Sequence, residues 1–484
     1  MKTTTLTLCL LSLSFSLAEA AEHLVPEDFP TIQEAIDASA PGDLVVVKEG
    51  TWKERLRLKA GVTVRSSGDD TRTEAGTLVR SAKTILDGSG APDDSPGVRM
   101  AKNSTLDGFT ITRIGTFDED RWKKDWDERG EQQSYEHIGT ISVPAVLIEG
   151  VDCTVRNNVV HDNGDTGIAI RGAGGTALVE HNHCFRNMGG GIGCMNGASA
   201  IIRKNTCYEN LFAGIGHDAA SPLVEENTCY GNVRAGIGIS EGSCPIVRKN
   251  LCYENRRSGI GIRTGEATRP IVENNECHGN GMSGIGIEKL ASPIIRGNRC
   301  FQNRMAGIGT RKGAKPVLVE NHCFENKASG IGSDDAEPLI LHNQVERNGS
   351  AGIGIRGESL AIAIGNTCTD NRAVAVGIPN GGKAILLSNR LARSEGKAPM
   401  VAILGGATAT LSGNTIEGGG VAAIMLDGSL SLVDNTLTGK GSGTGLVSRE
   451  GSEAFLVGNR FDGFARNLIG TGIESLPEAG EKPE

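Results

Sequence analysis

Residues 259–280 read GIGIRTGEATRPIVENNECHGN, and this phrase decides the fold because variants of it return along most of the chain. A Gly-Ile pair opens each copy, and successive pairs are 22 to 25 residues apart. The pairs begin at Gly167, Gly191, Gly214, Gly236, Gly259, Gly284, Gly307, Gly330 and Gly352. A repeat of this length predicts a solenoid, in which each unit buries its apolar side only against its neighbours.

Each copy of the phrase contains three short apolar segments separated by turn residues. In the copy quoted above these are residues 259–262, 270–273 and 276–278. Short apolar runs bounded by Gly, Pro and Asn are typical of β-strands. We therefore predict an all-β solenoid of about 17 coils, stacked at about 4.8 Å per coil.

An Asn marks the corner after the second segment of each coil, and a second Asn follows the third segment. The first column comprises Asn158, Asn182, Asn205, Asn227, Asn250, Asn275, Asn298, Asn321, Asn343, Asn366, Asn389, Asn414, Asn435 and Asn459. Stacked amides can hydrogen-bond to the amides above and below, and Asn tolerates left-handed backbone at a corner. Both columns are therefore predicted to be structural ladders.

Eight of the 12 cysteines share one position of the repeat. They are Cys184, Cys207, Cys229, Cys252, Cys277, Cys300, Cys323 and Cys368. Val160 and Val345 take the same position, which favours a column of buried thiols. Disulfides between coils and a metal site are the alternatives, but in-register side chains point the same way, and a straight row does not form a tetrahedron.

Residues 1–20 predict a cleavable export signal. Lys2 precedes an apolar run from Leu6 to Leu17, and residues 18–20 form a small-x-small cleavage pattern. The run is too short to span a bilayer and no later stretch reaches that length, so no transmembrane segment is expected. The mature protein is therefore expected to be secreted or periplasmic.

The mature chain divides into four parts. Residues 21–112 contain a short N-terminal helix and the first, irregular coils, and residues 113–145 form a charged insertion. Residues 146–470 carry the regular coils, and residues 471–484, rich in Glu, Pro and Gly, predict a disordered tail. The N-terminal helix is expected to cap the open apolar end of the solenoid.

The insertion carries Trp122 and Trp126 within a strongly charged stretch. A long insertion in a solenoid maps to one face, which is often the binding face. One interpretation is a solvated charged loop or short helix. The other is an aromatic lid over a groove, in which both tryptophans bind substrate.

These features resemble the right-handed parallel β-helix proteins of the pectate-lyase-like superfamily, in particular those with carbohydrate-binding and sugar-hydrolysis type repeats. The resemblance is carried by TIQEAI at residues 31–36, EGTW at 49–52, TILDG at 84–88 and the Gly-Ile repeats. It implies a single-stranded right-handed β-helix with a short N-terminal capping helix, and a polysaccharide partner. The fold hosts lyases, hydrolases, epimerases and binders, so the resemblance does not choose among them. The Arg-x-Pro-x-x-Arg of pectate lyases, the Asp-Pro-His-Asp of alginate epimerases and the Gly-His-Gly of polygalacturonases do not occur.

Alternation along the first strand of each coil places Ile inside and the flanking Gly columns outside. Such glycines would form a flat floor for a sugar ring, although Gly also eases tight stacking of coils. The next outward column reads Arg171, Met195, Asp218, Ser240, Arg263, Glu288, Arg311, Asp334 and Arg356. Its alternating signs favour an exposed ion-pair ladder. The functional alternative is a trough in which Arg171, Arg263, Glu288, Arg311 and Asp334 bind a uronic-acid polymer.

A candidate catalytic cluster lies near the insertion. Its members are Asp162, Asp165, His217, Asp218 and Arg234. Carboxylates with His or Arg can perform acid–base chemistry if the insertion folds over these coils. Such carboxylates also bind Ca²⁺, so Ca²⁺ is the cofactor to test, although no set of metal ligands stands out. His217 alone is better explained as an interior residue beside Cys194.

The third strand carries an outward aromatic column. Its members are Phe185, Tyr208, Tyr230, Tyr253, His278, Phe301 and Phe324. Rings about 4.8 Å apart can stack on one another. This column is interpreted as a structural stack or partner surface, with a carbohydrate platform as the alternative.

The formal net charge of −9 argues against a general nucleic-acid role. We expect an exported β-helix protein that binds or acts on a polysaccharide, with a uronic-acid polymer lyase or a glycoside hydrolase as the enzyme class. The alternative is a non-catalytic carbohydrate-binding or scaffold protein of the cell envelope. The sequence leaves the oligomeric state open.

Overall fold

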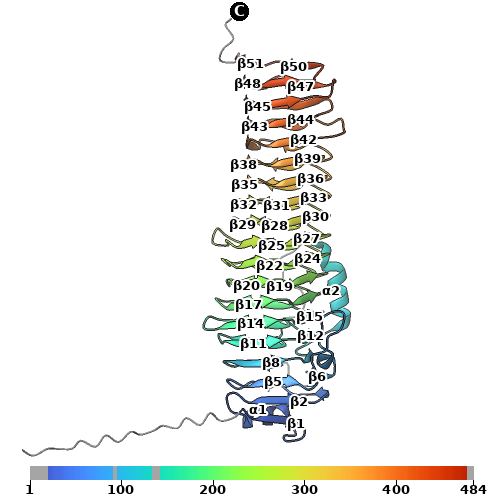
Figure 1. Ribbon diagram of the computed structural model, residues 1–484, viewed down its shortest axis with the longest axis vertical. Coiled ribbons are helices and arrows are strands. Elements are labelled where there is room, and N and C mark those ends of the chain that lie inside the picture. Colours follow the sequence, from blue (N-terminus) through green and yellow to red (C-terminus); the bar gives the residue numbers. More distant parts are fainter. Residues whose placement is uncertain (1–19, 91–94, 133–141, 477–484) are drawn as a thin grey trace, which may run out of the picture.

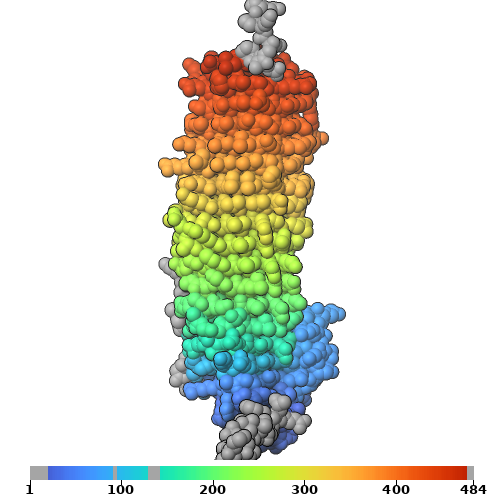
Figure 2. All heavy atoms as spheres, turned by 60° about the vertical axis from the view of Figure 1, so that its left-hand side comes forward, coloured from blue at the N-terminus to red at the C-terminus, as the bar shows by residue number. Residues whose placement is uncertain are grey.

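The computed structural model describes residues 20–90, 95–132 and 142–476. Within these ranges the chain winds into stacked coils of parallel strands that form an elongated rod (Figure 1). Figure 2 shows the coils as successive bands along the rod. The export signal expected at residues 1–20 lies outside the described residues, except for its last position.

Each regular coil contributes one strand to each of three rows, as the repeated phrase predicts. The first row contains β4 (Leu56–Arg57), β7 (Val98–Arg99), β10 (Val146–Glu149), β13 (Ile168–Arg171), β16 (Ile192–Met195), β19 (Ile215–Asp218), β22 (Ile237–Ser240), β25 (Ile260–Ile262), β28 (Ile285–Glu288), β31 (Ile308–Arg311), β34 (Ile331–Asp334), β37 (Ile353–Arg356), β40 (Val376–Ile378), the first halves of β43 (Val401–Ser412) and β45 (Ala422–Val433), β47 (Thr444–Ser448) and β50 (Arg466–Gly470).

The second row contains β1 (Glu22–Val25), β2 (Leu44–Val47), β5 (Thr63–Ser66), β8 (Ser104–Asp107), β11 (Cys153–Arg156), β14 (Thr176–Glu180), β17 (Ser199–Arg203), β20 (Leu223–Glu225), β23 (Ile246–Arg248), β26 (Ile271–Glu273), β29 (Ile294–Arg296), β32 (Val317–Val319), β35 (Leu339–Leu341), β38 (Leu360–Ile364), β41 (Lys383–Leu387), the second halves of β43 and β45, β48 (Glu453–Val457) and β51 (Ile473–Leu476). These strands mark about 19 turns of the solenoid, slightly more than the 17 predicted.

The third row contains β3 (Gly50–Trp52), β6 (Thr84–Asp87), β9 (Thr110–Thr112), β12 (Val159–His161), β15 (His183–Phe185), β18 (Thr206–Tyr208), β21 (Thr228–Tyr230), β24 (Leu251–Tyr253), β27 (Glu276–His278), β30 (Arg299–Phe301), β33 (His322–Phe324), β36 (Gln344–Glu346), β39 (Thr367–Thr369), β42 (Arg390–Ala392), β44 (Thr415–Glu417), β46 (Thr436–Thr438) and β49 (Arg460–Asp462). A 3₁₀ turn, Val79–Ala82, precedes β6.

The interior of the rod is filled by in-register columns of Ile and Cys. The cysteines of the repeat are all buried, and Val160 and Val345 continue their column at Cys184 and Cys323. None of the eleven described cysteines forms a disulfide. Burial raises the pKa of the Cys368 thiol to about 12, so it stays protonated at neutral pH. The column is therefore apolar packing, as the sequence predicts.

Both Asn columns form the predicted ladders. Asn227 illustrates one rung: its Nδ2 donates to Asn250 Oδ1 at 3.0 Å and to the Ile202 carbonyl at 2.9 Å. The left-handed residue, however, is the one before the ladder Asn, such as Glu226 with φ 56°. The chain turns at this residue, and the side-chain amide of the following Asn is then buried in the ladder.

The N-terminal end of the rod is capped by α1 (Ile32–Ala38). Ile32, Ala35 and Ile36 are fully buried, and the Thr31 hydroxyl accepts a hydrogen bond from the Glu34 amide at 3.2 Å. Strand β1 precedes the helix, and the sequence did not indicate this strand. At the other end, β51 continues to Leu476, beyond the predicted start of the tail at residue 471, and residues 477–484 lie outside the described residues.

The insertion contains α2 (Glu119–Gln132), which lies alongside the third row (Figure 1). Trp122 packs against Met188, Leu211 and Val233, which lie in the turns that lead from the third row to the first. This small cluster is separate from the main interior and attaches the helix to the rod. None of the described helices combines the length and apolarity required to cross a membrane.

Candidate functional site

A groove of about 640 Å³ crosses the first row from β13 to β37. Its floor is the outward face of nine successive first-row strands. One wall, called the entry wall, is formed by the residues two positions before each Gly-Ile pair. The entry wall comprises Asp165, Gly189, Phe212, Arg234, Arg257, Met282, Met305 and Ala328. The opposite wall, called the exit wall, is the outward charged column that runs from Arg171 to Arg356.

The first glycine of each Gly-Ile pair does not belong to this floor. A Cβ added at Gly236 would lie 2.8 Å from the Gly259 carbonyl oxygen and 2.8 Å from Asn255 Nδ2, and Gly259 and Gly284 are equally crowded. These glycines, called the packed column, allow adjacent coils to approach closely. We expected both glycine columns to face outward, and this is wrong for the packed column. A side chain at these glycines would point toward the ladder Asn and the backbone of the next coil.

The second glycine of each Gly-Ile-Gly segment does form a flat floor. This floor column comprises Gly193, Gly216, Gly238, Gly261, Gly286, Gly309, Gly332 and Gly354. None of them has a left-handed φ. A Cβ at Gly216 would meet nothing within 4 Å, and one at Gly238 would touch only Ala213 Cβ at 3.5 Å. Neither backbone conformation nor packing requires glycine at these two positions, and the result is a surface that a ligand can approach closely.

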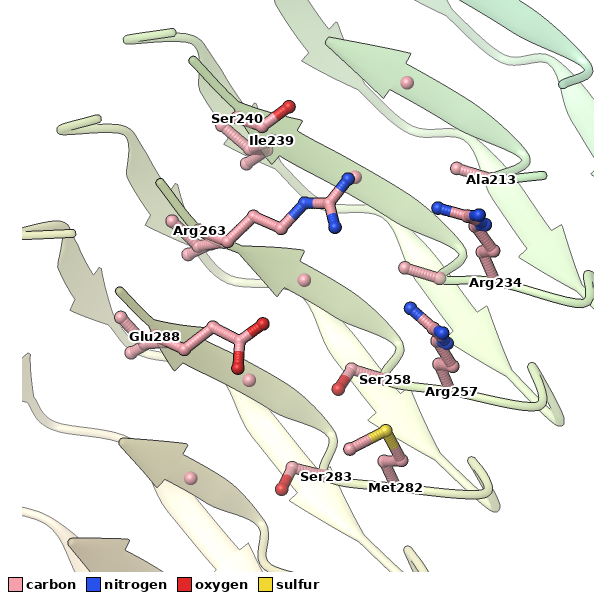
Figure 3. A pocket seen from close by; sticks show the side chains of 18 of the residues that line it. Ala213, Arg234, Ile239, Ser240, Arg257, Ser258, Arg263, Met282, Ser283 and Glu288 are labelled. Carbon is pink, nitrogen blue, oxygen red and sulfur yellow. The ribbon is translucent and has the colours of Figure 1, made fainter. Parts of the chain in front are cut away.

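The exit wall contains the ion pairing that its alternating signs suggest. Arg311 Nε and Nη2 each lie 2.7 Å from the Glu288 Oε2 atom, and Glu288 is 8% exposed. This pair contributes little net charge to the groove. Arg263, one coil before Glu288, extends over the floor (Figure 3).

The entry wall adds two arginines on successive coils. Figure 3 shows Arg234 and Arg257 side by side, with Ser258, Met282 and Ser283 on the same side of the floor. The Arg234 guanidinium lies 4.4 Å from the centre of the Phe212 ring, and the side chain is only 7% exposed. Stacking on an aromatic face orients the guanidinium plane.

The lining of the groove is cationic although the chain is acidic. Six arginines and four carboxylates line it, whereas the whole chain has a formal charge of −9. The arginines are Arg171, Arg234, Arg257, Arg263, Arg311 and Arg356, and the carboxylates are Asp165, Asp218, Glu288 and Asp334. An acidic ligand is therefore favoured here over a neutral or basic one.

Asp218 lines the groove, and the pKa of its carboxyl is raised above the ordinary value. Partial removal from water raises its pKa, Glu241 adds to the increase and Arg263 opposes it. A raised pKa brings a carboxyl closer to the range in which it can exchange protons near neutral pH. Asp165 also lines the groove, where its Oδ1 accepts a hydrogen bond from the Thr166 amide at 2.7 Å.

His217 faces the interior rather than the groove space. It pairs in register with Cys194, is 3% exposed, and its Nδ1 lies 2.9 Å from the Gly238 carbonyl oxygen. Burial lowers the pKa of its ring to about 4. The ring is therefore neutral at physiological pH and its position matches the interior interpretation, not that of a general base exposed to substrate.

Asp162 does not join the other candidate catalytic residues. Its carboxylate binds Arg186 Nε at 2.9 Å and His161 Nδ1 at 2.8 Å on the outside of the third row. Burial alone would raise the pKa of Asp162, but these two hydrogen bonds outweigh it and lower the pKa. Arg186 also pairs with Glu119, so the network fastens α2 to the rod.

The two insertion tryptophans do not line the groove either. Trp122 is 5% exposed with the Arg186 guanidinium 4.3 Å from its ring, and Trp126 has the Arg256 guanidinium at 3.9 Å. Trp126 Nε1 donates to the Gly231 carbonyl at 3.3 Å. Because these contacts use the ring faces, the tryptophans hold the helix in place and are not presented to a ligand in the groove.

The aromatic column of the third row forms one continuous stack that starts at His161. Neighbouring ring centres are 4.7 to 5.2 Å apart and the rings are nearly parallel. Each ring covers the face of the next, so only ring edges are left for solvent. A sugar platform requires an exposed ring face, so this geometry supports a structural stack.

Comparisons with known proteins agree with this architecture. Residues 144–269 and 254–392 match the family model described as the right handed beta helix region, and together they span more than half of the chain. The chain belongs to the right-handed beta helix family. A search of curated proteins gave no match.

Solved β-helix structures show only a distant likeness to this family member. A point mutant of the periplasmic alginate epimerase AlgG is 15% identical, with 69% of this chain and 80% of that chain covered and a TM-score of 0.47. The A-module of the mannuronan C-5 epimerase AlgE6 from Azotobacter vinelandii is also 15% identical, with 92% and 94% covered and a TM-score of 0.38. A GH87 alpha-1,3-glucanase from Streptomyces thermodiastaticus is 13% identical, with 76% and 61% covered and a TM-score of 0.37. Scores this low carry no argument about substrate.

Sequence reasoning overlooked most of the entry wall of this β-helix. Arg257, Met282 and Met305 line the groove but were not among the candidate residues. They share one position with Arg234, two residues before each Gly-Ile pair, so a column taken at that position would have found them. Among the described residues, no group of three or more His, Cys, Asp or Glu side chains is placed to hold a metal ion.

Proposed function

We propose that this protein binds an acidic polysaccharide, a polymer of uronic acids, lengthwise in the first-row groove. The observation that carries the proposal is a floor without side chains, bordered by arginines that outnumber carboxylates by six to four. Eight floor glycines on successive coils span seven steps of about 4.8 Å, or roughly 34 Å.

The chemistry of the walls suits carboxylated sugars. A guanidinium can donate two parallel hydrogen bonds to one carboxylate, which gives both affinity and orientation. The bare floor lets flat sugar rings lie against the backbone of the strands. A polysaccharide of this kind is met outside the cytoplasm, so the proposal includes the secreted or periplasmic location expected from residues 1–20.

Asp218 supports a second candidate function, cleavage of the bound polymer. A carboxyl with a raised pKa, two coils from Arg263, can take the proton next to a uronate carboxylate or protonate a glycosidic oxygen. These two steps correspond to a lyase and a glycoside hydrolase. Without such a step the same groove serves a binding or scaffold protein of the cell envelope.

The test is a panel of acidic and neutral polysaccharides offered to the purified protein. Binding is measured by calorimetry, and cleavage is followed through unsaturated uronate ends and through new reducing ends. Asp218→Asn is run beside the parent protein because it preserves shape and removes the titrating group.

The outcomes separate the candidates. Binding of acidic but not neutral polymers supports the proposal, and products that disappear in Asp218→Asn add the catalytic role. Binding without products leaves the non-catalytic protein. If no acidic polymer binds, or neutral polymers bind equally well, the proposed function is wrong.

A further inference from the structure

The entry wall changes character along the groove rather than repeating. Between β22 and β31 it presents Arg234, Arg257, Met282 and Met305 in that order. Two cationic coils are therefore followed by two apolar coils, at a spacing of about 4.8 Å each. A polymer with the same charge on every unit would therefore meet cationic side chains on two coils and apolar side chains on the next two.

The cationic part gathers three guanidiniums. Arg234 and Arg257 project from the entry wall, and Arg263 reaches over the floor from the exit wall (Figure 3). Arg257 lies in the turn before β25, and Arg263 directly follows it, so the two residues flank Gly261. Phe212 fixes the plane of Arg234 by stacking at 4.4 Å. These three residues are called the arginine subsite.

The next part of the groove is apolar and electrically balanced. Met282 faces the floor in Figure 3, and Met305 is 45% exposed on the following coil. Opposite them, Glu288 Oε2 accepts a hydrogen bond from Arg311 Nε at 2.7 Å and forms an ion pair with Arg311 Nη2. A ligand carboxylate placed here would lose hydration against methionine and would face the Glu288 carboxylate, which disfavours it. Met282 and Met305 are called the methionine subsite.

We propose that the groove recognises a polysaccharide whose carboxylate-bearing sugar is followed by an uncharged sugar, and that it does so with these two adjacent subsites. The inference rests on the proposed function, because it names the substrate class of the same groove. The arginine subsite binds the carboxylate of one sugar. The methionine subsite binds the apolar face of the next sugar through its flexible thioether side chains.

Two probes of different charge pattern test the ligand class. Hyaluronan oligosaccharides alternate a uronate with an uncharged N-acetylated sugar, and polygalacturonate oligosaccharides of equal length carry a carboxylate on every sugar. Calorimetric titration is expected to show at least about 10-fold tighter binding of the alternating polymer, the effect of one unfavourable charged contact removed. Equal or tighter binding of polygalacturonate overturns the inference but leaves the proposed function standing. Binding of neither probe overturns the inference, and the full panel of acidic polysaccharides then decides on the proposed function.

Matched arginine variants test whether recognition is local. Arg257→Gln is expected to weaken binding of the preferred acidic probe by about 10-fold to 100-fold, because charge-assisted hydrogen bonds are lost. Arg449→Gln, at an exposed arginine that does not line the groove, is expected to change it less than about 2-fold. Equal losses in the two variants would mean that overall charge drives binding and would refute the two-subsite arrangement.

A gain-of-binding variant completes the test. Met282→Arg continues the arginines of the entry wall by one coil and replaces half of the methionine subsite. It is expected to strengthen polygalacturonate binding and to weaken hyaluronan binding, with thermal unfolding unchanged as evidence of an intact fold. A variant that changes both affinities in the same direction contradicts the inference.

Discussion

Gly236, which directly precedes β22, and Gly238, which lies within it, provide the sharpest test of how the groove is built. Both are in the same Gly-Ile-Gly segment, and their neighbours differ. A Cβ at Gly236 would lie 2.8 Å from the Gly259 carbonyl oxygen and from Asn255 Nδ2, whereas a Cβ at Gly238 would meet only Ala213 Cβ at 3.5 Å. The substitutions Gly236→Ala and Gly238→Ala therefore add the same methyl group to a packed and an open position.

The expected effects on stability differ in size and sign. Gly236→Ala forces a backbone carbonyl and a ladder amide apart, and overpacking of this kind costs roughly 1–3 kcal/mol. Gly238→Ala adds ordinary van der Waals contact and restricts the unfolded chain, so it should change stability by less than about 1 kcal/mol and in the stabilising direction. The predicted difference between the two variants is thus about 1–4 kcal/mol.

Chemical denaturation followed by circular dichroism measures this difference. Gly238→Leu, at the same open position, should keep the stability of the parent and weaken polysaccharide binding, because its side chain occupies the floor. If Gly238→Ala destabilises the protein as much as Gly236→Ala, the floor glycines are there for packing. The argument that the bare floor serves a ligand would then fail.

Other parts of the molecule give further measurable expectations. Asn227→Ala removes the acceptor of the Asn205 amide and the donor to the Ile202 carbonyl. It should lower the free energy of unfolding, measured by chemical denaturation, by roughly 3 kcal/mol. A loss under about 1 kcal/mol would contradict a stabilising role of the ladder. Because burial lowers the pKa of His217 to about 4, the unfolded chain binds a proton between about pH 6.5 and pH 4 that the folded chain does not. Stability should therefore fall by roughly 3 kcal/mol as the pH drops through that window. His217→Ile should remove this component, and an unchanged pH profile would count against it. Cys244 is the one exposed cysteine among those described, so a thiol reagent should label one site in the folded mature protein and none in Cys244→Ser; labelling of further thiols before unfolding would contradict the buried column.

The regular part of the fold follows directly from the repeated phrase. Positions that recur every 22 to 25 residues must fall in the same column of a stacked solenoid, so Cys184 and Cys207 had to be neighbours. The Val at two positions of the Cys column identified it as interior. The predicted number of coils was slightly low because strands outside the phrase, such as β1 and β51, carry little periodic signal.

The candidate site was only half predictable. The exit wall lies next to the floor along the same strand, so strand alternation located Arg263, Glu288 and Arg311. The entry wall lies across a corner from the preceding strand, and the direction of a side chain at a corner depends on backbone dihedrals rather than on alternation. Arg257 and Met282 were missed for this reason.

The insertion shows the limit of sequence reasoning most clearly. Charged and aromatic residues in the insertion at 113–145 predicted either a solvated charged loop or short helix, or an aromatic lid, and both tryptophans were candidates for substrate binding. The choice was made by contacts distant in sequence, with Arg186 and Arg256 stacked on Trp122 and Trp126. No periodicity links residue 122 to residue 186, so only the assembled coils could place them together.

The sequence by itself determined the solenoid, its interior columns and its two Asn ladders, because a fixed repeat forces like residues into register. The tertiary structure alone decided which glycines pack and which lie open, and which wall faces the floor. The physical reason is that a repeat fixes which residues are neighbours in adjacent coils, but not which residues from different strands of one coil face one another. The direction in which the side chains of a column point is set by the backbone dihedrals at the corners and by contacts between coils. The groove depends on that direction.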